Sequence, residues 1–401
     1  MKSWLTSLSE QQPLAVITAS SVNTLSFARS LGRRGIPVLI LDSDRQLAIF
    51  TRFARVIYLE PSDRNPRAWI DQLVSIGRCL KTPGVLIPTA DPHCVLIAEN
   101  QDLLRPYFNF LVPKANEVRN FVSKRYQIEI ARGMGLAVPD SWFPNSLEEI
   151  ERLSDRVQYP CIVKPDRSHT GARLLAGKKL IVVDSKLDLI EAFVSLSGDD
   201  VSCIVQEIIP GADSELVSYL GFWNAESAEV AFITKRKLRQ FPKLYGNGSI
   251  QVSEELPEVA ELSRQLLKAL EYRGFASVEF KFDNRDGTYR FVEINPRTSA
   301  MNELAVVAGV DFPWIAYEIL SGATPLAEKG PAFRAGIRCV NEDWDLQAFW
   351  AMRKAGDITV REWLRSLQHA RRIISAWDDP KPLLMEMVRA SSLPFHRWNH
   401  R

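Results

Sequence analysis

The stretch Phe291-Val292-Glu293-Ile294-Asn295-Pro296-Arg297 decides the fold of this chain. Side chains of an extended strand alternate between two faces, so Glu293, Asn295 and Arg297 are expected to share one face. Apolar residues are expected on the opposite face of this strand and of the one before it: Val278, Phe280, Phe282, Val292 and Ile294. Such a face packs against a core, which argues against a hairpin whose charges simply face water.

A second carboxylate lies in the preceding strand-like run, at Glu279. The turn between the two runs, residues 283–287, has the Asp, Asn and Gly content of a hairpin. Folding this hairpin brings Glu279 close to Glu293 and Asn295. Two carboxylates and an amide oxygen beside Arg297 place hard oxygen ligands next to a phosphate-binding group. They indicate a magnesium site that holds nucleotide phosphates rather than a zinc site.

Phosphate-binding features also lie upstream. Lys164 stands near the end of a short apolar strand, and a polar loop that contains Gly171 follows it. A lysine at a strand end binds phosphates as a point charge while backbone amides of the loop close over them. The next strand, residues 204–209, leaves into a Pro-Gly bend followed by Asp213. Such a strand can offer backbone groups to a purine edge and a carboxylate to ribose hydroxyls.

The order of these features resembles the ATP-grasp superfamily, in particular its carboxylate–amine ligases, which include D-aspartate ligase and the carbamoyl-phosphate synthetase large subunit. The resemblance covers about residues 10–325. It implies the following roles: Lys124, Lys164 and Gly171 for phosphates; Gln206, Glu207 and Ile209 for an adenine hinge; Asp213 for ribose; Glu279, Glu293 and Asn295 for magnesium; and Arg297 for the transferred phosphoryl group. The loop after Lys164 departs from the pattern, because only Gly171 precedes Gly177 where many relatives have more glycines.

The resemblance implies a ligase that uses ATP and Mg²⁺, or Mn²⁺ in its place. It activates a carboxylate as an acyl phosphate and couples it to an amine, releasing ADP and phosphate. Electrostatics and positioning carry phosphoryl transfer, so none of the five histidines and five cysteines has to be catalytic, and the general base is unassigned. Two alternatives stay open: an ATP-dependent carboxylase or carbamoyl-phosphate-type enzyme, and a non-catalytic nucleotide-binding regulatory module.

Composition limits the partners. A net charge of +2 with 24% charged residues lacks the one-sided basic field that nucleic acid or a membrane surface requires. The five cysteines are scattered through apolar runs and are expected to be reduced thiols. No apolar run approaches the ~18 residues of a membrane span. We therefore expect a cytoplasmic protein that binds ATP and small-molecule substrates, with a homodimer left open.

The first 112 residues alternate strand-like and helical runs, which predicts an α/β domain with a doubly wound parallel sheet. It opens with strands over residues 14–18 and 36–42. The turn over residues 19–23 contains no glycine, which argues against a dinucleotide-binding fingerprint, although Asp42 lies where a ribose-binding acid could.

Asp91 follows another predicted strand of this domain, at residues 85–89. The carboxyl ends of parallel strands form the usual ligand edge of an open sheet, so Asp91 could touch the acceptor substrate. Alternatively, it caps the next helix ahead of Pro92. The sequence leaves both interpretations open.

Two further units are expected. Residues 113–325 form a two-lobed α+β ATP-grasp domain, with a small lobe over about 113–210 and a large lobe over about 211–325. A helix beginning near Asn116 is expected to contain Lys124. Residues 326–401 form a mostly helical C-terminal appendage packed on the main body. Its tryptophans have helical spacing, which favours core packing over nucleic-acid stacking: Trp344, Trp350, Trp363 and Trp377.

A basic strand lies between the hinge and the metal strands. In a strand, Lys235, Lys237 and Arg239 face one side, where they could meet nucleotide phosphates, a substrate carboxylate or both. Lys237 and Arg239 are therefore predicted catalytic residues alongside Arg297, with Arg239 favoured to hold the carboxylate through its planar fork. The alternative is an exposed edge strand whose charges prevent aggregation. Residues 246–249 look like a closing loop with glycine hinges.

Overall fold

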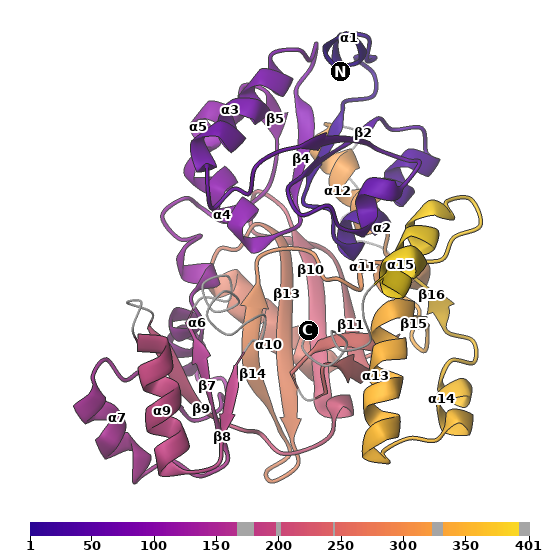
Figure 1. Ribbon diagram of the computed structural model, residues 1–401. Helices are drawn as coiled ribbons and strands as arrows, with labels where there is room; N and C mark the ends of the chain where they lie inside the picture. The colour runs from indigo at the N-terminus through magenta and orange to yellow at the C-terminus, as the bar shows by residue number, and fades with distance from the viewer. Residues whose placement is uncertain (167–179, 198–201, 244, 323–331, 393–401) are drawn as a thin grey trace.

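The computed structural model describes residues 1–166, 180–197, 202–243, 245–322 and 332–392. Gly171 and the loop contacts expected around it lie outside the described residues. Figure 1 shows an N-terminal α/β unit above a large central sheet, with a smaller lobe to its lower left and the C-terminal helices to its right. Within the described ranges, no helix has the length and apolar content needed to cross a membrane.

The N-terminal unit contains a five-stranded parallel sheet in the order β3-β2-β1-β4-β5, which confirms the predicted doubly wound architecture. Its strands are β1 (Ala15–Thr18), β2 (Val38–Asp42), β3 (Arg55–Tyr58), β4 (Gly84–Pro88) and β5 (Phe108–Asn109). Every residue of β1, β2 and β4 is buried, because helices cover both faces of a parallel sheet.

The helices of this unit are α1 (Lys2–Thr6), α2 (Val22–Arg33), α3 (Pro66–Gly77), α4 (Asp91–Glu99) and α5 (Gln101–Leu104), with the 3₁₀ turn η1 (Leu47–Phe50). The acid at the end of β2 is not available to a ribose: Asp42 is 2% exposed and accepts hydrogen bonds from the backbone N–H groups of Asp44 and Arg45. These contacts close the turn that follows β2, and together with the glycine-free sequence before α2 they argue against a dinucleotide site.

The small lobe is a four-stranded antiparallel sheet in the order β6-β9-β7-β8. Its elements are β6 (Ser141–Trp142), β7 (Cys161–Pro165), β8 (Ile181–Val183), β9 (Cys203–Glu207), α7 (Leu147–Ser154) and α9 (Lys186–Ser197). The turn η2 (Asn120–Val122) and helix α6 (Lys124–Gly133) precede it. The helix expected from Asn116 thus begins later, at Lys124, because the side chain of Ser123 caps it by accepting from the N–H of Tyr126.

The central sheet has seven strands in the order β14-β13-β10-β11-β12-β15-β16. The large lobe supplies β10 (Leu216–Trp223), β11 (Glu229–Phe241), β12 (Asn247–Ser253), β13 (Gly274–Asp283) and β14 (Thr288–Asn295), with η3 (Asp213–Glu215), α10 (Pro257–Ala269), α11 (Asn302–Ala308) and α12 (Phe312–Leu320). The closing loop predicted over residues 246–249 is wrong, since β12 begins at Asn247 and pairs with β11.

The C-terminal segment contains α13 (Glu342–Ala355), α14 (Val360–Ser366) and α15 (Lys381–Ser392), together with β15 (Arg338–Val340) and β16 (Arg371–Arg372). It does more than pack on the main body. Strand β15 pairs antiparallel with β12, and β16 pairs parallel with β15, so the segment extends the central sheet. The prediction that the tryptophans of this segment pack in the core is only partly correct, because Trp350 and Trp377 are 58% and 95% exposed.

The same segment returns to the N-terminal unit, where Figure 1 shows α15 beside α2. Between β16 and α15, Asp379 is fully buried and accepts hydrogen bonds from Arg29 Nε at 2.9 Å, Thr51 Oγ1 at 2.7 Å and the N–H of Arg52 at 2.9 Å. Arg29 also donates to the backbone carbonyl of Ile373. The end of the described chain is thus fastened to its beginning.

Candidate functional site

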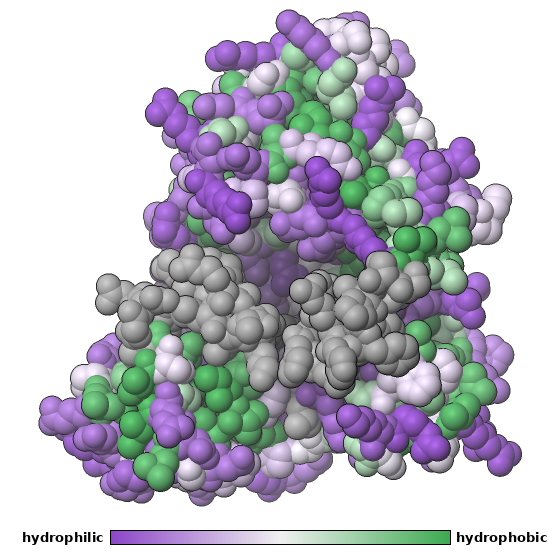
Figure 2. Space-filling view, in the orientation of Figure 1, coloured by the Kyte–Doolittle hydropathy of each residue, from purple (hydrophilic) through white to green (hydrophobic). Residues whose placement is uncertain are grey.

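A cavity of about 840 Å³ lies where the small lobe, the central sheet and the N-terminal unit meet. Figure 2 shows a hydrophilic hollow at the centre of the molecule, below the N-terminal unit. Ten of the predicted site residues line the cavity: Lys124, Lys164, Gln206, Glu207, Ile209, Lys237, Glu279, Glu293, Asn295 and Arg297. Asp213 and Arg239 are not among the lining residues. The volume suits a nucleotide with its substrates, since ligand cavities commonly measure about 300–1,000 Å³.

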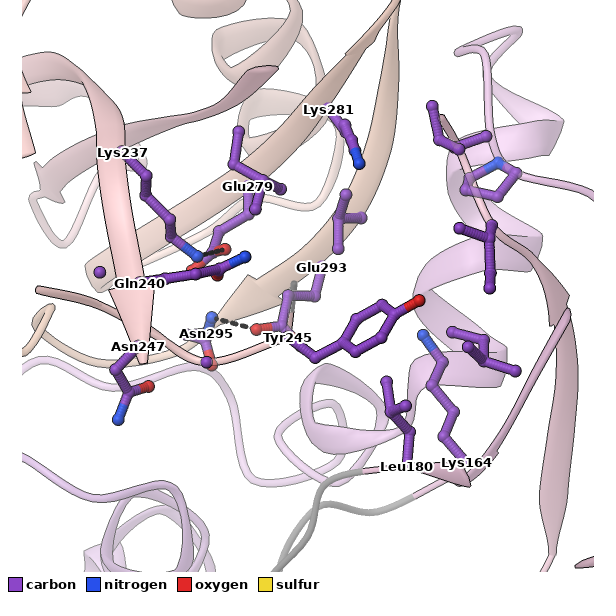
Figure 3. Close-up of a pocket in the computed structure, with 18 of the residues that line it drawn as sticks. Lys164, Leu180, Lys237, Gln240, Tyr245, Asn247, Glu279, Lys281, Glu293 and Asn295 are labelled. Atoms are coloured by element: carbon purple, nitrogen blue, oxygen red, sulfur yellow. Dashed lines mark hydrogen bonds and ion pairs between the residues drawn. The ribbon is translucent and has the colours of Figure 1, made fainter. Parts of the chain in front are cut away.

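The predicted hairpin of β13 and β14 is confirmed, and it brings the expected oxygen ligands together. Glu279 pairs with Glu293 across the two strands, and Ser277 pairs with Asn295. Asn295 Nδ2 donates to Glu293 Oε1 at 3.0 Å, an interaction drawn in Figure 3. Like charges directly opposite each other destabilise a sheet, so a cation between the two carboxylates would relieve their repulsion.

These residues fit a magnesium ion. Mg²⁺ prefers carboxylate and carbonyl oxygens and is usually held by one or two carboxylates together with substrate phosphates. Within the described part of the chain, no three His, Cys, Asp or Glu residues gather into a metal-binding group. Glu279, Glu293 and the amide oxygen of Asn295 form a set of two carboxylates and one amide, which is the set that the sequence predicted.

A β-bulge in this hairpin changes one of the predicted faces. The register shifts after Glu279, so that Phe280 pairs with Phe291 and Val292 has no direct partner. Phe280 and Phe291 are both fully buried, whereas Val292 lines the cavity. The prediction that Val292 joins the apolar face is therefore wrong, because the extra residue reverses the alternation before Glu293.

The two lysines expected to bind phosphates lie on the same cavity. Lys124 is the first residue of α6, and its backbone N–H donates to the carbonyl of Asp166 after β7. Lys164 of β7 is 7% exposed, and its Nζ donates to Gln206 Oε1 at 2.8 Å. Burial, together with the charge of Lys124, lowers the pKa of Lys164 to about 8. Among the residues that the structure describes, Lys164 has no anionic hydrogen-bond partner, and a buried lysine of this kind is suited to a phosphate ligand.

The hinge lies at the end of β9, where Gln206, Glu207 and Ile209 line the cavity. The side chain of Glu207 forms an ion pair with Arg285 of the β13–β14 turn at 2.7 Å. Asp213 follows the hinge in η3 and accepts a hydrogen bond from Gln240 Nε2 at 2.7 Å. Gln240 lines the cavity and Asp213 does not, so the ribose role of Asp213 stays a prediction.

The basic strand β11 follows its predicted alternation only in part. Lys235 and Lys237 line the cavity, and Lys237 Nζ lies 3.0 Å from Glu279 Oε2. The register of β11 with β12 shifts on both sides of Arg239, so Gln240 reaches the cavity instead. The prediction that Arg239 shares this face is wrong, and its assignment to a substrate carboxylate loses its basis.

Arg297 joins the central sheet to the N-terminal unit. Its Nε lies 2.8 Å from Asp91 Oδ1, and its Nη2 donates to Asn295 Oδ1 at 3.2 Å. Helix α4 has Ala90 at its N-cap without a side-chain cap, so Asp91 does not cap it. Asp91 instead lies on the cavity wall, as the ligand-edge interpretation requires.

Several lining residues escaped the sequence analysis: Leu180, Val182, Asp184, Gln240, Tyr245, Gln251, Ser299 and Trp344. In Figure 3 the ring of Tyr245 projects between Glu293 and Lys164. No motif marks these residues. They reach the cavity because the lobes and the C-terminal helix α13 close around it, and only the alternation of β12 could have indicated Gln251.

Comparisons with known proteins agree with this geometry. Residues 223–343 match the family "ATP-grasp in the biosynthetic pathway with Ter operon". The chain is 21% identical to D-aspartate ligase of Enterococcus faecium over 77% of its own length and 76% of the relative's. Among solved structures, N5-carboxyaminoimidazole synthetase of Staphylococcus aureus is similar with a TM-score of 0.62 and 15% identity, covering 86% of this chain and 85% of that one. L-amino acid ligase of Bacillus licheniformis is similar with a TM-score of 0.59 and 14% identity, and the match covers 78% of this chain and 75% of that one.

An antiparallel small lobe faces the central sheet, with lysines on one side of the cavity and paired carboxylates on the other, which defines a two-lobed α/β protein. The structural similarity shows that this chain has the ATP-grasp fold, and the family match covers the part of that fold over residues 223–343.

Proposed function

We propose that this protein is an ATP-dependent ligase that joins a carboxylate to an amine, with release of ADP and phosphate. The observation that carries the proposal is the meeting of Glu279, Glu293 and Asn295 with Arg297 and Lys164 around one cavity. An oxygen-ligand set opposite buried cations suits the transfer of a phosphoryl group, whose charge must be neutralised on several sides.

In the first step, an oxygen of the carboxylate attacks the γ-phosphorus of ATP, and the bond to the bridging oxygen of ADP breaks. Lys124 and Lys164 bind phosphate oxygens, while Arg297 stabilises the negative charge of the transferred group. Asp91 and Asn295 hold the Arg297 guanidinium in place through the contacts described above. Glu279, Glu293 and Asn295 would hold Mg²⁺, which would supply positive charge to neutralise the phosphates.

In the second step, the nitrogen of the amine attacks the acyl carbon, phosphate leaves, and the nitrogen loses a proton. The product is an amide. The hinge residues Gln206, Glu207 and Ile209 would place the adenine, since they line the cavity at the junction of the two lobes. We propose small-molecule substrates and leave the homodimer and the cytoplasmic location as predictions.

A second candidate is an ATP-dependent carboxylase with bicarbonate as the acceptor, and it has support in the fold. Structural neighbours include a biotin carboxylase of Campylobacter jejuni, at a TM-score of 0.60 and 15% identity. A regulatory module that binds nucleotide without chemistry has less support, because Glu279, Glu293, Asn295 and Arg297 all line the cavity.

A coupled assay of ADP release tests these functions. Pairs of amino acids and small carboxylates are screened with MgATP, and a parallel reaction contains bicarbonate alone. ADP release that needs both a carboxylate and an amine supports the ligase. Release with bicarbonate alone supports the carboxylase, and MgATP binding without release under any condition supports the regulatory module. Glu258→Gln, an exposed substitution on α10, serves as the matched control for changes at the metal carboxylates.

A further inference from the structure

One buried lysine of the cavity is not used by this mechanism. Lys235 of β11 lines the cavity and is 3% exposed. Its Nζ donates to Gln251 Oε1 of β12 at 2.8 Å and to Ser299 Oγ, after β14, also at 2.8 Å. Both partners are neutral, and the described residues include no carboxylate that accepts a hydrogen bond from Lys235. An ammonium group has three donors, so one remains for a ligand in the cavity.

Neighbouring cations differ from Lys235 in having carboxylate partners. Lys237 pairs with Glu279, and Arg297 pairs with Asp91. On the other face of β11, Arg236 pairs with Glu254 at 2.6 Å. Lys235 is thus a buried cation whose hydrogen bonds go to an amide and a hydroxyl while the cations around it are neutralised.

Such an arrangement is unfavourable until an anion arrives. Burying a charge without an opposite charge costs several kcal/mol or shifts its pKa towards the neutral form. Burial, with smaller contributions from Lys237 and Arg297, lowers the pKa of Lys235 to about 7, although Glu279 opposes the shift. A carboxylate beside Lys235 would remove this penalty and stabilise the ammonium.

The place of Lys235 in the sheet says which anion fits. Lys235 pairs with Ser218 of β10, and Ser218 pairs with Glu279 of β13, which in turn faces Glu293. Neighbouring strands lie about 4.8 Å apart, so the backbone of Lys235 lies roughly 10 Å from that of Glu279. A small substrate could therefore contact both Lys235 and the phosphate bound through the metal at Glu279 and Glu293. Ser299, which accepts a hydrogen bond from Lys235, comes two residues after Arg297 in the sequence.

We propose that Lys235, positioned by Gln251 and Ser299, binds the carboxylate of the acid substrate that attacks ATP. This inference rests on the ligase function proposed above, and it replaces Arg239, whose side chain is turned away from the cavity. The amide of Gln251 and the hydroxyl of Ser299 orient the ammonium without neutralising it. That leaves its charge for an incoming carboxylate, which a glutamate at either position would not do.

The experiment separates the acid site from the nucleotide site. Wild-type protein saturated with MgADP is titrated calorimetrically with acetate, malonate, succinate and D-aspartate. The same titrations use Lys235→Met, which keeps the length and apolar stem of the side chain. Arg236→Met is the matched control, because it removes a cation from the next position of the same strand on the face away from the cavity. MgADP titrations and thermal melting of all three proteins report nucleotide binding and folding.

We expect at least one of these carboxylates to bind the wild type and the Arg236→Met control alike, and to bind Lys235→Met about 10- to 100-fold more weakly, with MgADP affinity unchanged. Ser299→Ala, which leaves the charge in place, should weaken carboxylate binding by a smaller factor. Equal affinity of wild type and Lys235→Met for every carboxylate that binds would overturn the proposal. So would the absence of carboxylate binding to a wild-type protein that binds MgADP. Failure of the wild type to bind MgADP would instead reject the proposed function itself.

Discussion

Arg239 and Asp345 form a buried ion pair that joins strand β11 to helix α13. Arg239 Nη1 lies 2.7 Å from Asp345 Oδ1, and the two side chains are 6% and 2% exposed. Ser249 Oγ and Trp363 Nε1 also donate to the same carboxylate, at 2.9 and 2.8 Å. This group of contacts fastens the C-terminal helices to the central sheet at a point beside the cavity but outside it.

Arg239→Met should therefore reduce stability and leave substrate binding intact. Removing one partner of a buried pair leaves the other charge uncompensated, which typically costs about 3–5 kcal/mol. The free energy of unfolding in urea measures this loss. The double variant Arg239→Met/Asp345→Leu should lose less than the sum of the two single variants, because it leaves no charge unpaired. A stable Arg239→Met protein with a raised KM for the acid substrate would instead restore the predicted substrate contact.

Glu293→Gln should fold normally and fail in phosphoryl transfer. The substitution keeps the shape of the side chain and removes one of two facing carboxylates, so the repulsion across β13 and β14 also falls. A loss of ~4 kcal/mol of transition-state stabilisation corresponds to about a thousandfold in rate. ADP formation over a range of magnesium concentrations and thermal melting measure the two effects, with Glu258→Gln as the control. Near-wild-type turnover by a folded Glu293→Gln protein would exclude the metal assignment.

Lys164→Met should weaken MgATP binding and remove part of its pH dependence. One lost charge-assisted contact costs roughly 1.5–3 kcal/mol. In the free protein, burial sets the pKa of Lys164 at about 8, so the protonated form that phosphates prefer is lost as pH rises above that value. Wild-type affinity should fall roughly tenfold between pH 7 and pH 9.5, since phosphate binding raises the pKa of the lysine. Titration calorimetry at both pH values checks this, and an equal decline in Lys164→Met would assign the pH dependence to another group.

His93 should make the protein less stable in mild acid. The imidazole is buried, stacks on Trp69 at 4.7 Å between ring centroids, and lies 2.9 Å from Thr18 Oγ1 through Nδ1. Burial lowers its pKa from 6.5 to about 4. The unfolded chain therefore binds the proton more tightly, so the stability contributed by neutral His93 is fully present above pH 6.5 and is lost as pH falls towards 4.

The comparison of wild type with His93→Gln isolates this contribution. Between pH 7 and pH 4.5, the unfolding free energy of the wild type should fall by roughly 2–3 kcal/mol more than that of the variant. His369 is exposed, and His369→Gln serves as the control that should follow the wild type. Parallel pH curves for wild type and His93→Gln would show that the buried imidazole does not set the acid response.

The sequence predicted those parts of the fold and site that depend on regular periodicity. The parallel N-terminal sheet follows from continuous apolar runs, and the hairpin of Glu279 and Glu293 follows from alternation around a turn with Asp, Asn and Gly. Both are local patterns, and the sheet register then places the two carboxylates opposite each other.

The errors occur where one extra residue changes a strand. Bulges displace Val292 and Arg239 from their predicted faces, and nothing in the side chains around them marks an insertion. Contacts between segments distant in sequence, such as that of Asp91 with Arg297, could not be predicted either. The ion pair between them depends on how the N-terminal unit sits on the central sheet, which no local pattern records.

The buried carboxylate of Asp379 bears on where this protein can be divided. The motifs end near residue 325, which suggests that everything after that point could be removed. A chain cut there would lose Asp379 and the carbonyl of Ile373, which accept hydrogen bonds from the buried Arg29 guanidinium. It would also expose the edge of β12 that pairs with β15. The smallest piece that can fold is therefore longer than the piece that carries the recognisable motifs, because residues of the C-terminal segment close the structure around α2.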